Sequence, residues 1–157
     1  MFMVDTPVHY LISAALTAAL TVLCVGIHYE ALKLISSFHP KRLSGNLNIG
    51  AVILLIIVTH CVEAIVFSLG YWLGTHVLPI GRLSGMREHG AIAYIYFSLE
   101  TFTTQSIGDI IPVGPIRLLA SVQPLVGLIL IGWSTSFTFL IMRRDWRGDD
   151  EERLETH

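Results

Sequence analysis

The sequence predicts an all-α integral membrane protein in which three helices cross the bilayer and a fourth, shorter helix enters it and returns. Of its 157 residues, 53% are hydrophobic and only 14% are charged, whereas about 25% are charged in an ordinary soluble domain. Three apolar runs are long enough to cross a bilayer. A fourth apolar run is too short to cross, and polar residues follow it directly.

The three long runs occupy residues 10–27, 49–73 and 118–142. Each is near or above the roughly 20 residues that a helix needs to cross the hydrocarbon core. The first and third contain no charged residue, whereas the second contains His60 and Glu63. We therefore expect three transmembrane helices.

Basic residues predict the orientation of these helices. They gather between the first and second runs and in the C-terminal tail, at Lys33, Lys41, Arg42, Arg143, Arg144, Arg147 and Arg153. The positive-inside rule places both segments in the cytoplasm and the N-terminus outside, which requires three crossings. Tyr71 and Trp72 are then expected in an outer aromatic belt and Trp146 in an inner one.

The short run, residues 91–103, would reach only about 20 Å as a helix, so it must enter from the outer side and return there. Non-helical backbone is tolerated at membrane depth only against protein or around a water-filled cavity. One chain with three helices cannot surround such a loop, so we expect copies of the chain to meet around a symmetry axis. Inward-pointing carbonyl groups in such a ring form a cation filter, and the partially negative C-terminal end of the short helix favours a cation there.

Residues 96–112, YFSLETFTTQSIGDIIP, resemble the pore signature of tetrameric potassium channels, most closely small bacterial channels with two helices per pore module. The resemblance extends over residues 49–142. It implies three segments: an N-terminal helix with a cytoplasmic connector (1–47), an ion-channel pore module (48–143) and a short cytoplasmic tail (144–157).

The resemblance also implies a function. We expect a homotetramer in a bilayer, in a bacterial inner (plasma) membrane, that conducts ions passively along its axis. No enzymatic activity is expected, no cofactor apart from a permeant monovalent cation (K⁺ or Na⁺), and no nucleic-acid partner. Two rival hypotheses remain open: a non-conducting channel-like scaffold or subunit, and a small proton-coupled transporter that uses His60 and Glu63.

The selectivity filter of this family, Thr-Val-Gly-Tyr-Gly, is matched here by Thr104, Gln105, Ser106, Ile107 and Gly108. The first glycine permits a backbone conformation that residues with a Cβ adopt reluctantly, and a serine in a left-handed conformation costs roughly 1–2 kcal/mol. Ile107 also lacks the tyrosine hydroxyl that anchors the family's filter. We therefore expect altered or reduced potassium selectivity, with the Gln105 amide able to turn into the pore.

Four residues are matched to the support of the filter: Tyr96, Glu100, Thr103 and Asp109. The resemblance implies that Glu100 and Asp109 form a carboxyl pair that shares a proton, because two close carboxylates in a low dielectric do not both ionise. Alternatively, Glu100 is a lone helix residue that faces an aqueous crevice. The Tyr96 hydroxyl is expected to bond Asp109. Thr103 and Thr104 end the short helix, either as part of an ion site or as a plain turn.

The third long run contains Gly127, which the resemblance makes either a gating hinge or a close-packing contact. Pro124, three residues earlier, is expected to kink the helix. Ile131, Thr135 and Thr138 lie near the face of Gly127 at helical spacing. They either line a wet inner cavity or, for the threonines, bond back to their own helix.

His60 and Glu63 are one helical turn apart within the second run and can share a face. An ionisable residue within a membrane is a functional candidate by default, here as a pH sensor or as a proton or metal site. The alternative is a buried hydrogen-bonded pair that fixes helix packing, with His28 as a further partner. One His and one Glu are too few ligands for a metal, so beyond the permeant cation no metal is expected.

Overall fold

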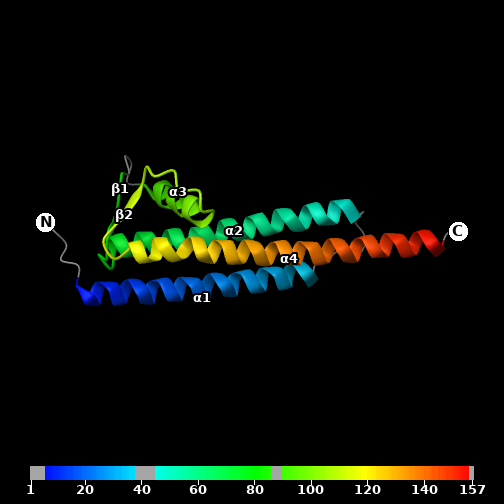
Figure 1. The fold of residues 1–157 in the computed structure, drawn as a ribbon, viewed down its shortest axis with the longest axis horizontal. Helices are drawn as coiled ribbons and strands as arrows, with labels where there is room; N and C mark the ends of the chain where they lie inside the picture. Colours follow the sequence, from blue (N-terminus) through cyan, green and yellow to red (C-terminus); the bar gives the residue numbers. More distant parts are fainter. Residues whose placement is uncertain (1–5, 38–44, 86–89, 156–157) are drawn as a thin grey trace.

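The computed structural model describes residues 6–37, 45–85 and 90–155. Four helices and two short strands follow one another in the order α1 (Pro7–Ser37), α2 (Gly45–His76), β1 (Arg82–Ser84), α3 (Ala91–Phe102), β2 (Ile111–Val113) and α4 (Arg117–Glu155). Figure 1 shows the three long helices side by side, with α3 and both strands grouped beside one end of α2 and α4.

The three long helices confirm the predicted transmembrane helices. Helical stretches Pro7–Ser37, Ile49–His76 and Arg117–Arg144 are long and apolar enough to cross a bilayer. Only 22–28% of the most apolar window of each is buried within the chain, so most of this apolar surface is left for lipid or for other copies. Helix α3 has 12 residues, which at 1.5 Å per residue is too short to cross.

Helix α1 packs against both α2 and α4 through one side. The residues that it buries recur every three or four positions, as expected for one face of a helix: Ser13, Thr17, Leu20, Cys24, His28, Leu32 and Ile35. At the end of the molecule that carries the strands, the Ser13 hydroxyl donates a hydrogen bond of 2.7 Å to the Pro115 carbonyl. Helix α1 is therefore hydrogen-bonded to the segment that directly precedes α4.

The two strands form a small antiparallel ladder that the sequence did not predict. Its register pairs Arg82 with Val113 and Ser84 with Ile111. Gly85, directly after β1, has a φ of +97° and packs so closely on the Asp109 carbonyl that a Cβ would collide with it. The ladder thus ties the segment after α2 to the segment that leads into α4.

The prediction of an outer aromatic belt is wrong for Tyr71 and fits Trp72. Tyr71 is 0% exposed, because it faces inward and contacts the Phe97 ring edge-on at a centroid separation of 4.9 Å. Trp72, the next residue along the helix, is 44% exposed. Lys41 and Arg42, on which the predicted orientation partly rests, lie outside the described residues, as does the side chain of Trp146.

Candidate functional site

The end of α3 is closed by the loop that follows it. The backbone N–H groups of Thr103, Thr104 and Gln105 donate to carbonyls of the last turn. The Thr103 hydroxyl also turns back, to the Leu99 carbonyl at 2.9 Å. These bonds engage the carbonyls of Leu99, Glu100 and Thr101, so the chain leaves the helix after Phe102 with these three groups paired.

Residues 104–108, called here the 104–108 loop, have an alternating backbone. Thr104, Ser106 and Gly108 have φ values of +63°, +34° and +86°, whereas Gln105 and Ile107 lie outside the left-handed region. Alternation of this kind turns successive N–H groups to one side of the chain and the carbonyls to the other. Ser106 therefore has the left-handed conformation, which is unfavourable for a residue with a Cβ. All five residues are exposed in the single chain.

Glu100 lies behind this loop and holds it. Its side chain is buried, and its Oε1 accepts a hydrogen bond of 3.0 Å from the Ile107 N–H. Asp109 is exposed in the single chain, and its proton-sharing pair with Glu100 stays a prediction. Glu100 is not a lone residue in a crevice, since it binds the loop backbone.

Tyr96 lies beside both carboxyls, and its hydrogen bond to Asp109 stays a prediction. Partial burial, and then the neighbouring Glu100 and Asp109 groups, raise the pKa of its hydroxyl, because negative charges oppose formation of the phenolate. The Tyr96 hydroxyl therefore keeps its proton at neutral pH and remains a hydrogen-bond donor next to the loop.

Gly127 of α4 is a contact point for the end of α3. A Cβ built on Gly127 would lie inside 3.0 Å of the Phe102 carbonyl oxygen and 3.1 Å from the Phe102 carbonyl carbon. The geometry thus favours the close-packing alternative over the hinge. Helix α4 is continuous through Pro124.

Below this contact, residues 53–60 of α2 and 131–142 of α4 border a groove of about 450 Å³, called here the inner groove. Ile131, Thr135 and Thr138 all line it. The Thr135 hydroxyl donates to the Ile131 carbonyl and the Thr138 hydroxyl to the Ser134 carbonyl, each at 2.9 Å. The threonines therefore bond back to their own helix, as the second alternative expects, and they also border the groove; a wet inner cavity stays a prediction.

A buried polar network was missed by the sequence reasoning. The Tyr71 hydroxyl donates to Gln123 Oε1 at 2.6 Å. Gln123 Nε2 donates to the carbonyl and hydroxyl oxygens of Ser98 at 3.0 and 2.8 Å, and the Ser98 hydroxyl donates to the Ala64 carbonyl at 2.6 Å. These residues belong to α2, α3 and α4, so the network fixes α3 between the two long helices. The available signal was Gln123 itself, the only amide side chain in the apolar run 118–142.

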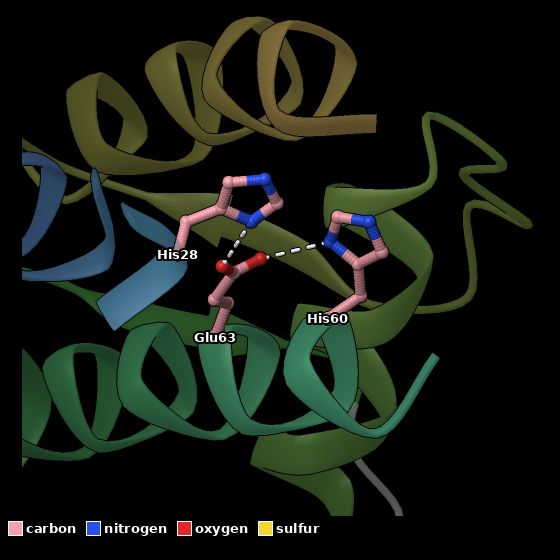
Figure 2. A group of neighbouring side chains, drawn as sticks. All are labelled: His28, His60 and Glu63. Carbon is pink, nitrogen blue, oxygen red and sulfur yellow. Dashed lines mark hydrogen bonds and ion pairs between the residues drawn. The ribbon is translucent and has the colours of Figure 1, made fainter. Parts of the chain in front are cut away.

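The ionisable residues of α2 form a second polar centre, with His28 of α1. Figure 2 shows the Glu63 carboxylate between two imidazole rings. His28 Nδ1 is 2.8 Å from Glu63 Oε1, and His60 Nδ1 is 2.9 Å from Oε2. The Ser134 hydroxyl lies 3.1 Å from His60 Nε2 and 3.4 Å from His28 Nε2. The predicted His60–Glu63 contact is confirmed, and His28 joins it.

A family model described as ion channel matches residues 49–144, which is more than half of the chain. The match includes α3, the 104–108 loop and the parts of α2 and α4 that can cross a bilayer, and it leaves out α1. No curated protein and no solved structure matches the chain.

Proposed function

The chain belongs to the ion channel family, and on that premise we propose that it is a cation channel of the potassium-channel type, in which four copies surround an axial pore. The observation that carries this proposal is the 104–108 loop. It follows a helix too short to cross the bilayer, its φ values alternate in sign at Thr104, Ser106 and Gly108, and Glu100 holds it from behind. A backbone that presents its carbonyls to one side is what a cation requires in place of its hydration shell.

The fourfold assembly is argued from what the single chain leaves uncovered. Every residue of the loop is exposed, yet irregular backbone at membrane depth needs protein or water around it. A groove of about 430 Å³ lies between the loop and the outer half of α4, bordered by Thr104, Ser106 and Pro124. We propose that a neighbouring copy packs there, while water and ions occupy the axis.

The proposed selectivity follows from the middle of the loop. Ser106 takes a left-handed conformation, at a cost of roughly 1–2 kcal/mol in each copy. Ile107 has no hydroxyl to brace the loop laterally, and among the described residues its backbone N–H is bonded only to Glu100. We propose a filter less selective for K⁺ than a Thr-Val-Gly-Tyr-Gly filter, which passes K⁺ and Na⁺, in a bacterial inner membrane with the N-terminus outside.

Planar-bilayer recording of the purified protein tests the proposal. We expect a particle of four chains in detergent, discrete unitary currents, and a reversal potential near zero with K⁺ on one side and Na⁺ on the other. A reversal potential that follows K⁺ alone would overturn the proposed selectivity and leave the channel intact.

Two other results would support one of the two rival functions in place of a channel. A tetramer that is silent in every cation gradient identifies a scaffold or subunit. Cation uptake that follows a pH gradient without unitary currents identifies a transporter that uses His60 and Glu63. A stable monomer would contradict the shared axis.

A further inference from the structure

We propose that His28, His60 and Glu63 form a binding site for a divalent transition-metal ion of the Zn²⁺ class, which fastens α1 to the pore module. The site brings together residues of α1 and α2 (Figure 2). The Ser134 hydroxyl of α4 lies within hydrogen-bond distance of both rings. The side chains of His28 and Glu63 are 0% exposed and that of His60 is 17% exposed.

The four polar contacts of the cluster need one hydrogen more than two neutral rings, an ionised Glu63 and the Ser134 hydroxyl supply. Four contacts need a hydrogen each: two between Glu63 and the rings, and two between the rings and Ser134. With Glu63 ionised and both rings neutral, each ring supplies one hydrogen and the Ser134 hydroxyl supplies one. One contact then lacks a hydrogen, and a single negative charge stays buried in an apolar environment, which is unfavourable. A divalent cation bound between these ligands replaces the missing hydrogen and offsets the charge of Glu63; the net charge of the site is then +1, or zero when the water in the fourth position of the ion is deprotonated.

The orientation of the rings fits a metal ion. If both Nε2 atoms carry the ring hydrogen, both donate to Ser134 Oγ, which has two acceptor lone pairs. Both Nδ1 lone pairs then face the Glu63 oxygens, and the ligand atoms of the three residues all lie within 4.8 Å of one another. Histidine ligands usually donate their second N–H to a fixed oxygen, which sets ring orientation. Ser134 is placed to accept both of these hydrogen bonds.

The ligand types select the class of ion. Two imidazoles and one carboxylate suit Zn²⁺ and related transition metals, whereas Ca²⁺ and Mg²⁺ prefer oxygen ligands alone. The Cys24 thiol, although near, is directed at the Glu63 backbone carbonyl with a separation of 3.7 Å, so it is not counted as a ligand. Three protein ligands leave a fourth position for water.

Access to the site comes from the inner groove. His60 and Ser134 both line that groove, whereas His28 and Glu63 are closed off by the surrounding helices. An ion in the groove therefore reaches the open edge of the cluster at His60. Since α1 lies outside the matched residues 49–144, the site would couple a helix that the family match does not include to the two helices of the pore module.

Metal titration of the purified, chelator-stripped full chain tests this proposal without measuring conduction. We expect one Zn²⁺ per chain by elemental analysis, tight enough to compete with a chromophoric chelator, and a higher melting temperature with Zn²⁺ than without. His28→Gln and Glu63→Gln should each weaken binding at least tenfold, and Ser134→Ala should weaken it by about 10–100-fold, as loss of an outer partner does. His76→Gln is the matched control: His76 lies on the same helix as His60, stacked on Trp72 and outside the cluster, and its loss should change nothing.

Three results would overturn the proposal. The first is that the folded wild-type protein binds no Zn²⁺, which would leave a proton as the occupant. The second is that the His28→Gln and His76→Gln variants bind Zn²⁺ equally well. The third is that Co²⁺ substituted at the site shows the strong charge-transfer band of a thiolate ligand. If Glu63→Gln does not assemble, His60→Gln and Ser134→Ala answer the same question, because each keeps the carboxylate.

Discussion

Replacement of Gly127 by alanine places a methyl group against the end of α3. The new Cβ would lie inside 3.0 Å of the Phe102 carbonyl oxygen, 3.1 Å from its carbonyl carbon and 3.4 Å from its ring Cδ1. The nearest atom belongs to the backbone, so relief requires α3 or α4 to move by about 1 Å. Overpacking of this kind costs about 1–3 kcal/mol, and alanine regains about 0.5–1 kcal/mol of helix preference. The net loss is about 1–2 kcal/mol in each copy.

Thermal unfolding of the detergent-solubilised protein measures this loss. A chain of this length is expected to melt roughly 2–8 °C lower for that change in free energy. Gly132→Ala is the matched control, since it lies on the same helix and, apart from the nearby backbone of that helix, no atom of the described residues lies within 4 Å of its Cβ position; its melting temperature should stay level or rise. If Gly127→Ala melts no lower than the wild type and changes only channel opening, Gly127 is a hinge and the packing argument is refuted.

Three further substitutions test the surroundings of the pore. Glu100→Ala leaves the Ile107 N–H without its acceptor, at a cost of about 1–3 kcal/mol. We therefore expect lower tetramer stability and an altered ratio of K⁺ to Na⁺ permeability. Unchanged values of both would contradict the role of Glu100. Gln123→Leu removes the partner of the buried Tyr71 hydroxyl, so it should destabilise the folded protein by about 1–3 kcal/mol. In the double variant with Tyr71→Phe, the loss of stability should be smaller than the sum of the two single losses. Additive losses would show that the bond contributes little. Ser106→Gly removes a left-handed residue with a Cβ and should stabilise each copy by roughly 1 kcal/mol while shifting the reversal potential toward that of K⁺; lower stability would show that the Ser106 side chain makes contacts between copies.

The spans were predictable because hydropathy is summed over about 20 residues, so no single residue decides the outcome. The conformation of Ser106 was also predictable, because a glycine position in a known pattern fixes the backbone before any contact is known. The β1–β2 ladder was not, since each strand has three residues and includes no alternating pattern long enough to indicate a strand.

Contacts between distant residues account for the other differences. Tyr71 and Gln123 are 52 positions apart, and His28 and Glu63 are 35 positions apart. Nothing in either local pattern states which face of one helix meets which face of the other. The sequence alone marked Glu63 and His60 as costly in a membrane, yet their full set of partners required the arrangement of α1, α2 and α4.

The contact between α1 and Glu63 also constrains how the protein is made. His28 is synthesised 35 residues before Glu63, so α1 enters the translocation machinery before its hydrogen-bond partner does. A lone ionisable side chain in the middle of a span is unfavourable in lipid. Stable insertion of α1 therefore depends on α2 arriving next to it, and the two helices are expected to leave the translocon as a hairpin.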